Sequence, residues 1–225
     1  GLLREVAKRG LTPSMTFHPG TQCECAEAWD TYIAACAQIA KRAGVGLARL
    51  NVGGGFAAQR GAEPQALAQV FDVITASTQR AFGEDAPALV CEPGRAMVAE
   101  ALTLVLRVKW RRSADGALFL NDGIYGALRE ASDIGLGARL QWRGADGQIK
   151  TQALQPAILF GPTCDSLDRI PEEVPVPKDV TDGDYLVIAG AGAYTAVLTT
   201  QFNGYGTRNV VSEATLLSGH FVNAG

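Results

Sequence analysis

The sequence predicts a mixed α/β chain whose first part alternates strands with helices and whose second part consists mostly of strands. In the first part, three short apolar runs recur every ~35–40 residues with a helical pattern between them, which is typical of βα units and a parallel sheet. After Arg95, short strand patterns alternate with polar or glycine-rich turns. We therefore expect two domains, over residues 1–103 and 104–225, without a flexible linker.

Each element of the first part is predicted by a spacing pattern. Apolar residues three and four positions apart predict helices, and Gly or Pro marks the ends of these helices. Apolar runs that stop at turn residues predict strands. In chain order we expect a helix over 2–9, a strand over 14–18, a helix over 27–43, a strand over 48–52, a helix over 64–82 and a strand over 88–91.

The second part carries no comparable helical pattern. A run of β-branched and apolar residues predicts a strand over 101–110. Four shorter runs predict strands over 117–121, 149–154, 157–160 and 185–189. Polar or glycine-containing turns, such as the one over 145–147, separate these strands and indicate a small all-β domain.

Composition excludes several classes of protein. The chain has 225 residues, of which 47% are hydrophobic and 19% charged, and its net charge of −3 offers no basic surface for nucleic acid. No apolar run reaches the ~18–20 residues of a membrane span. Five unevenly spaced cysteines and only two histidines indicate no disulfide framework, no metal site and a cytoplasmic location. The chain opens without Met and without a signal peptide, which suggests a piece of a longer polypeptide.

Chemically distinctive residues follow each strand of the first part. His18 ends the first strand, the triplet Gly53–Gly55 follows the second, and Glu92 with Arg95 follows the third. In a βα barrel, functional residues gather at the carboxyl ends of the strands. The bare N–H groups of three glycines suit a phosphate, for which Arg95 is a plausible second ligand. The imidazole of His18 can stack on a flat ring or exchange protons near neutral pH.

Each of these stretches also has a plainer interpretation. The glycines can form a turn without a ligand, Glu92 and Arg95 can form a local ion pair, and a lone histidine is more often packed than catalytic. The glycines also match the G-x-G-x-x-A pattern of dinucleotide-binding domains, with Asp72 near the distance at which that fold has an acid. Residues 59–62, however, break the helix that this fold requires, so we do not favour it.

A thiol and two carboxylates follow the strand predicted over 157–160. The stretch Gly161–Asp168 turns at Gly-Pro and then presents Cys164, Asp165 and Asp168, a density that a simple turn does not need. Two further glycine-rich turns carry Tyr125 and Tyr194, and each by itself is equally consistent with a packed tyrosine. Of the other cysteines, we expect Cys91 in the core and treat the remaining three as structural, namely Cys23, Cys25 and Cys36.

Six stretches taken together, in this order, resemble the fold-type III, PLP-dependent ornithine/lysine/diaminopimelate/arginine decarboxylases, and most closely the ornithine decarboxylase branch. The resemblance covers nearly the whole chain. Residues 17–22 resemble the family motif F-H-V-G-S-Q, residues 50–56 resemble L-D-I-G-G-G-F, and residues 92–95 match E-P-G-R. Residues 121–126 resemble D-G-V-Y-G, and residues 161–168 match G-P-T-C-D-S-x-D. Residues 192–195 and 202–204 together resemble G-A-Y-T…F-N-G.

The resemblance implies a fold and a cofactor. It implies that residues 1–103 are the C-terminal part of an alanine-racemase-like (β/α)8 barrel, and that residues 104–225 form a β-sandwich or β-barrel domain whose C-terminal part returns to the barrel. The cofactor would be pyridoxal 5′-phosphate (PLP). His18 would stack on its pyridine ring, and Glu92 would keep the pyridine nitrogen protonated. The phosphate would be held by Thr21, by the amides of Gly53, Gly54 and Gly55, by Arg95 and by Tyr194.

The resemblance also implies a shared active site and a reaction. Family members are homodimers, and Cys164 and Asp165 would reach the partner's site. Cys164 would protonate the product carbon after CO2 leaves, and Asp165 would bind the distal ammonium of the substrate, with Tyr125 lining the pocket and Asp133 assisting. The implied reaction is decarboxylation of a basic amino acid in polyamine biosynthesis, L-ornithine to putrescine or L-lysine to cadaverine. No nucleic acid or membrane partner is implied.

The chain departs from the family pattern at several positions. Asn51 replaces the usual Asp, Pro19 a Val and Ala57 a Pro. The family's Schiff-base lysine lies in a context like A-V-K-A-N, which none of the lysines of this chain matches, these being Lys8, Lys41, Lys109, Lys150 and Lys178. We therefore expect the first βα units of the barrel, with that lysine, to lie outside this sequence, and the chain alone to show strongly reduced turnover until that N-terminal segment is supplied.

Two alternatives remain open on sequence grounds. The first is a diaminopimelate- or carboxynorspermidine-type decarboxylase, although those resemble C-E-S-x-D where this chain has Cys164-Asp165-Ser166. The second is a non-catalytic homologue that binds a regulator, as antizyme-inhibitor-like proteins do. The presence of Glu92 and Arg95, together with Cys164 and Asp165, counts against this second alternative. The choice between ornithine and lysine depends on packing behind Asp165 and stays open.

Overall fold

The computed structural model describes residues 1–60, 66–137, 139–206 and 209–212. They divide into two compact units. The first comprises residues 1–104 with the returning segments 136–140 and 188–193, and the second comprises residues 105–135, 141–187 and the chain from 194 onward. Among the residues described, no helix is both long and apolar enough to cross a membrane.

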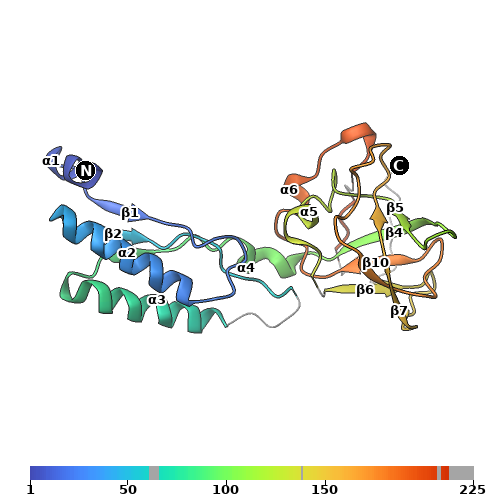
Figure 1. The fold of residues 1–225 in the computed structure, drawn as a ribbon, viewed down its shortest axis with the longest axis horizontal. Helices are drawn as coiled ribbons and strands as arrows, with labels where there is room; N and C mark the ends of the chain where they lie inside the picture. Colours follow the sequence, from blue (N-terminus) through green and yellow to red (C-terminus); the bar gives the residue numbers. More distant parts are fainter. Residues whose placement is uncertain (61–65, 138, 207–208, 213–225) are drawn as a thin grey trace. The chain divides into compact units, whose positions relative to one another are not determined.

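A parallel three-stranded sheet forms the centre of the first unit. Strands β1 (Ser14–Thr16), β2 (Arg49–Asn51) and β3 (Ala88–Val90) pair in that order, with Met15 opposite Leu50 and Leu50 opposite Leu89. The helices are α1 (Leu2–Lys8), α2 (Glu27–Ala43) and α3 (Leu67–Phe82), and α2 and α3 lie side by side along the sheet (Figure 1). The predicted βα alternation and parallel sheet are therefore confirmed.

The core of this unit lies between α2, α3 and the sheet. Trp29, Ile33, Cys36 and Ala40 are buried along α2 at three- and four-residue spacing, which is the pattern that predicted the helix. The helix ends at Gly44, whose left-handed φ of 62° suits glycine. In the core, Trp29 stacks on Phe56 and donates its indole N–H to the carbonyl of Val52 at 3.2 Å. This packing fixes the segment that follows β2.

The second part of the chain is dominated by strands. A five-stranded sheet has the order β6-β10-β4-β5-β8, and β7 pairs antiparallel with β9 in a separate ribbon. The strands are β4 (Leu104–Arg111), β5 (Leu118–Leu120), β6 (Leu140–Arg143), β7 (Leu154–Ala157), β8 (Leu159–Phe160), β9 (Val174–Pro177) and β10 (Tyr185–Ile188). Along β4, buried residues 104, 106 and 108 alternate with exposed ones, which is the pattern of a strand with one face in a core.

Short helical segments join these strands. They are α4 (Arg95–Val98), α5 (Ala131–Ile134) and α6 (Thr195–Leu198), with single 3₁₀ turns at Gly83–Asp85, Ala99–Ala101 and Phe202–Gly204. None of them was predicted, because a helix of about one turn has too few residues to show a period.

Several predicted boundaries are wrong, for identifiable reasons. The strand expected over 149–154 begins only at Leu154, since Ile149 and Lys150 instead close a turn back onto β6. Strands β6 and β9 were not predicted. Strand β9 contains Pro175 and Pro177, which disfavour a central strand but are tolerated where the segment pairs with β7 alone. The helix expected over 64–82 begins at Leu67, and residues 61–65 lie outside the described part of the chain.

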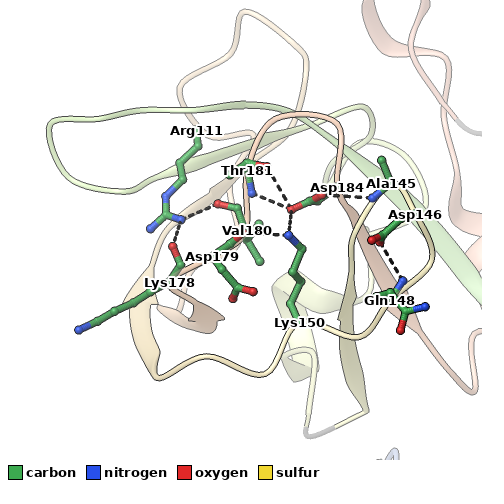
Figure 2. Close-up of polar contacts among 10 residues, drawn as sticks. All are labelled: Arg111, Ala145, Asp146, Gln148, Lys150, Lys178, Asp179, Val180, Thr181 and Asp184. Carbon is green, nitrogen blue, oxygen red and sulfur yellow. Dashed lines mark hydrogen bonds and ion pairs between the residues drawn. The ribbon is translucent and has the colours of Figure 1, made fainter.

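An ion pair between the partly exposed Lys150 and the buried Asp184 ties the loops of the second unit together (Figure 2). Lys150 Nζ lies 3.2 Å from Asp184 Oδ2, and the carboxylate of Asp184, 4% exposed, also accepts the backbone N–H groups of Ala145 and Thr181. Lys150 donates in addition to the carbonyl of Asp179 at 3.1 Å. The loop before β10 and the turn after β6 are thus anchored at one charged centre.

Candidate active site

The predicted residues at the ends of the parallel strands do lie close together. The backbone N–H of Glu92 donates to the carbonyl of Gly53 at 2.8 Å. A Cβ placed on Gly54 would lie 2.7 Å from the Glu92 carbonyl oxygen and 3.3 Å from His18 Nε2. Because the three strands run parallel, their carboxyl ends bring His18, the glycine triplet and Glu92 to one edge of the sheet.

The glycine triplet is required by close packing of the backbone. A Cβ on Gly53 would lie 2.2 Å from the carbonyl oxygen of Phe17, and one on Gly55 would lie 2.1 Å from the carbonyl oxygen of Gly20. Both glycines also have a left-handed φ, 71° and 84°. The second strand end therefore packs directly against the loop after β1, and no larger residue fits.

His18 is oriented by its own loop. Its Nδ1 accepts a hydrogen bond from the backbone N–H of Gly20 at 3.0 Å, so the neutral ring carries its proton on Nε2. That nitrogen is the one on the side of Gly54. Gln22 secures the same loop, because its side-chain amide both donates to the carbonyl of Ala58 and accepts the N–H of that residue. Sequence reasoning gave Gln22 no role of its own.

Asn51 links two of the strand ends. Its side-chain oxygen accepts the N–H of Gly53 at 2.9 Å, and its amide nitrogen donates to Glu92 Oε1 at 2.5 Å. An aspartate at this position could accept from Gly53 but could not donate to a carboxylate. The departure from the family's Asp, noted on sequence grounds, thus changes the hydrogen bonding of Glu92 directly.

The remaining predicted phosphate residues lie in different environments. Arg95 is the first residue of α4 and is buried, with 5% of its surface exposed. Thr21 is exposed in the loop after β1. Tyr194, 46% exposed, precedes α6 in the second unit and has a left-handed φ of 63°. Cys91 is exposed, contrary to the expectation of a core residue. The residues of β3 before it are exposed too, because β3 is an edge strand of the described three-stranded sheet.

The loop over residues 161–168 is held in shape by Asp168. The carboxylate of Asp168 is buried and accepts hydrogen bonds from the N–H of Ile124 at 3.0 Å and from the N–H and hydroxyl of Thr163 at 3.0 and 2.7 Å. Its backbone carbonyl accepts the N–H of Gly161 at 2.8 Å. Asp168 therefore closes this loop and fixes it to the turn that carries Tyr125.

Asp165 and Tyr125, both predicted in the substrate pocket, form a direct hydrogen bond. The Tyr125 hydroxyl donates to Asp165 Oδ2 at 2.5 Å, and the N–H of Leu167 donates to Oδ1 at 2.9 Å. The tyrosine hydrogen bond, followed by that of Leu167, lowers the pKa of Asp165 below its ordinary value. The same contact, with some burial and the charge of Asp165, raises the pKa of Tyr125. Asp165 is thus an ionised carboxylate in a fixed orientation.

Cys164 is contacted by a segment to which sequence reasoning assigned no role. The side-chain amide of Asn203 donates to Cys164 Sγ at 3.4 Å. Next to it, the Phe202 ring packs on the Tyr125 ring with centroids 4.5 Å apart, and Thr200 donates twice to the Tyr125 carbonyl. The F-N-G motif over residues 202–204 marked this segment in the sequence, but the motif does not show which of its side chains contacts the thiol.

A cavity of about 740 Å³ opens beside this loop. Its lining includes Cys164 and Asp165 together with a row of three aromatic rings. In this row Phe119 lies tilted against Trp110 and stacked on Phe160, with ring centroids 5.2 and 5.0 Å apart. Two residues predicted at the substrate pocket, Tyr125 and Asp133, are not among the residues that line this cavity. Tyr125 contacts the lining residue Asp165, whereas Asp133, on α5, pairs with Arg129 at 3.2 Å. A carboxylate, a thiol and aromatic faces together suit a flexible ligand that carries an ammonium group.

The described residues contain no group of three or more His, Cys, Asp or Glu side chains placed to hold a metal ion.

The structure brings the predicted site residues together in two separate sets. One is an imidazole, a glycine turn and a carboxylate at the strand ends of the first unit. The other is the thiol, carboxylate and phenol of the second unit.

Comparison with known proteins assigns these features to one family. The model of the pyridoxal-dependent decarboxylase C-terminal sheet domain matches residues 28–192. Ornithine decarboxylase 2 of Drosophila melanogaster is 30% identical over 203 residues, which are 84% of this chain and 49% of that protein. Antizyme inhibitor 2 of Xenopus laevis is 27% identical over 210 residues, which are 85% of this chain and 45% of that protein.

A solved structure shows the same relationship. The lysine/ornithine decarboxylase of Vibrio vulnificus complexed with cadaverine superposes with a TM-score of 0.73 at 27% identity, over 94% of this chain and 59% of that one. The chain thus spans about half the length of the curated relatives it matches. Because the family model covers most of the chain, the protein belongs to the fold-type III, pyridoxal-phosphate-dependent decarboxylases.

Proposed function

We propose that the protein carrying this chain decarboxylates a basic amino acid, either L-ornithine to putrescine or L-lysine to cadaverine. The observation that carries this proposal is the ionised carboxylate of Asp165, which is held by Tyr125 and lines the same cavity as Cys164. Such a carboxylate pairs with the distal ammonium of a dibasic amino acid. It also rejects an apolar analogue, since that analogue would leave the charge without a partner.

The strand-end cluster of the first unit fits the cofactor of this family. Its glycine turn leaves no room for side chains beside His18 and Glu92, and Glu92 presents a carboxylate whose Oε1 is already fixed by Asn51. In the proposal, Glu92 accepts the pyridine N–H and His18 covers the ring. The phosphate is held by the amides of the glycine triplet with Thr21, Arg95 and Tyr194. Bound PLP supplies a ring that withdraws the electron pair left when CO2 departs.

The second unit delivers the groups that handle substrate and product. Asp165 binds the distal ammonium of the substrate. The carboxylate that leaves as CO2 is thereby placed at the opposite end of the substrate. Cys164 then gives its thiol proton to the product carbon. On the resemblance to the family, these residues serve the strand-end site of a second copy of the protein, so that the active enzyme is a homodimer.

The test is a product assay on the full-length protein with PLP. Ornithine, lysine, arginine and diaminopimelate are offered in turn, and we expect putrescine or cadaverine as the main product. Asp165→Asn should raise KM for the preferred substrate by at least ~10-fold, because a neutral amide loses the charge-assisted bond. Ser166→Ala, one residue along the same exposed loop, is the matched control. Absence of CO2 release from all four amino acids would refute the proposal.

A second candidate comes from the similarity to antizyme inhibitor 2. In that case the protein would bind a regulator and would have no use for the thiol. The fixed Asp165 beside Cys164 and the Glu92 cluster favour the enzyme. A PLP absorbance band that disappears on borohydride reduction, with the label on a lysine outside the five of this chain, is expected of the enzyme and not of the binding homologue.

A further inference from the structure

We propose that Asn203 is a positioning residue for Cys164, whose side-chain amide stabilises the sulfur when it carries negative charge. This inference rests on the proposed role of Cys164 as proton donor. It starts from the contact in which Asn203 Nδ2 donates to Cys164 Sγ at 3.4 Å. An N–H group aimed at sulfur favours the form that bears the charge.

The chemistry of the step creates a need for such a donor. When the S–H bond breaks and the new C–H bond forms on the product carbon, the electron pair stays on Cys164 as a thiolate. Cys164 and the ionised Asp165 line the same cavity, so in the proposal the two negative charges repel each other. Asn203 offsets the repulsion with a neutral donor, and solvent then returns a proton to the sulfur.

The backbone at Asn203 is built to hold this amide in place. Asn203 has a left-handed φ of 53°, a conformation that Asn and Gly adopt with little cost. On one side Phe202 stacks on Tyr125, and Thr200 donates its N–H and its hydroxyl to the Tyr125 carbonyl at 2.9 and 2.6 Å. Tyr125 in turn holds Asp165. The side chains of Thr200, Phe202 and Asn203 thus brace both functional groups of the loop.

The charged groups around the thiol belong to the same unit. Asp165 and Asp168 lie in its own loop, and Lys109 from β4 and Tyr205 line the same cavity. None of these four donates to Sγ among the hydrogen bonds of the described residues, whereas Asn203 does. A change at Asn203 therefore alters the hydrogen bonding of the sulfur without removing any of these charges.

The test measures how fast iodoacetamide alkylates Cys164, without substrate. Cys23, Cys25 and Cys91 are also accessible, so the rate is read from the Cys164 peptide by mass spectrometry on the full-length protein, with Cys164→Ser as the blank. Asn203→Asp has the same shape and tolerates the same φ, but replaces the donor by an anion. At pH 7 we expect it to slow alkylation by about tenfold, because the thiolate is the reactive form.

Two further variants make the outcome decisive. Asn203→Gly keeps the left-handed backbone and removes only the amide, and we expect it to slow alkylation about threefold at pH 7. Gln201→Glu adds the same charge as Asn203→Asp two residues away and is expected to leave the rate unchanged. Near pH 10, where thiols are largely ionised, the effect of Asn203→Gly should vanish or reverse, since a sulfur without a donor is the better nucleophile.

Contrary results are equally clear. If Asn203→Asp and Asn203→Gly alkylate at the wild-type rate at pH 7, or if both are slowed equally at pH 7 and pH 10, the amide acts only on access to the thiol and the inference fails. Melting temperatures show that each variant is folded before its rate is compared. Because the assay needs no amino acid and no turnover, it can fail while the protein still decarboxylates ornithine or lysine, and it can succeed if the protein does not.

Discussion

At the scale of residues, single hydrogen bonds hold the side chains that are predicted to act in the site. Asn51 donates to Glu92, Tyr125 donates to Asp165, and Asn203 donates to Cys164. In each case a neutral donor meets a group to which the resemblance assigns a catalytic or binding role. These pairings determine in which direction each functional atom is held and how its charge is stabilised.

The Tyr125–Asp165 bond gives the first prediction. In Tyr125→Phe we expect the pKa of Asp165 to rise toward its ordinary value, because only the N–H of Leu167 still donates to it. A carboxylate whose pKa is depressed by folding contributes stability above its unfolded pKa, and that contribution is lost as the pH falls through the folded value. The stability difference between wild type and variant should therefore be present at pH 7 and diminish as the pH falls below the ordinary Asp pKa of about 3.9.

An NMR titration of the Asp165 carboxyl carbon checks this prediction, with melting curves at pH 3 and pH 7. Tyr205→Phe is the matched control, since that tyrosine lines the same cavity without donating to Asp165 among the hydrogen bonds of the described residues. An unchanged titration midpoint in Tyr125→Phe would show that the hydroxyl does not set the ionisation of Asp165.

At the scale of elements, short parallel strands and tightly closed loops bring the functional groups into position. The ends of β1, β2 and β3 pack so closely that glycine is the residue that fits between them. In the second unit, the loops between strands are closed by buried carboxylates, Asp168 in one and Asp184 in the other. Two predictions concern these contacts.

Gly54→Ala should destabilise the first unit by roughly 1–3 kcal/mol and weaken PLP binding, because the added methyl group would lie 2.7 Å from a backbone oxygen of Glu92. Gly46→Ala is the control, since a Cβ there meets nothing within 4 Å and its φ is not left-handed. Urea unfolding and a PLP titration measure the two effects. Equal stability of the two variants would mean that the strand ends can separate without cost.

Lys150→Met should destabilise the second unit by on the order of 3 kcal/mol, because it leaves the buried charge of Asp184 with only neutral donors. Adding Asp184→Asn should recover part of that loss, since the neutral amide buries no charge and its oxygen can still accept a backbone N–H. Asp146→Asn is the control, because its exposed side chain can still accept the N–H of Gln148 (Figure 2). Thermal unfolding measures all three, and a cost below about 1 kcal/mol for Lys150→Met would contradict the proposed anchor.

At the scale of the whole molecule, the two groups of predicted site residues lie in two separate units. The strand-end cluster belongs to the first unit and the Cys164 loop to the second. The chain also spans about half the length of its curated relatives, so the activity of the whole protein stays a proposal. Subunit mixing tests the part of that proposal which concerns the homodimer.

Glu92→Gln and Asp165→Asn, each impaired alone when assayed well below the KM of Asp165→Asn, should recover activity when mixed in the full-length protein. If each site combines Glu92 of one subunit with Asp165 of the other, half of the random dimers contain one intact site, and the mixture should reach about 25% of wild-type activity. No recovery in a mixture that demonstrably exchanges subunits would place both residues in the same subunit's site.

Local patterns in the sequence determine much of this protein. Helix α2 was predicted with its correct bounds, Glu27–Ala43, because its apolar spacing and its final glycine depend only on neighbours in the chain. The parallel order of β1, β2 and β3 followed from the helices between them. The motif residues could be recognised for the same reason, since each lies within a short contiguous stretch.

Only the tertiary structure decided how those stretches meet. Asn203 reaches Cys164 across 39 positions of sequence, and Asn51 reaches Glu92 across 41. Strand β9 forms despite its prolines because β7 pairs with it, and Cys91 is exposed although it follows an apolar run. The sequence by itself determined which chemical groups the chain carries and the helices and strands that present them. Which donor holds which functional atom depends on long-range contacts, and these are set by packing that no local pattern encodes.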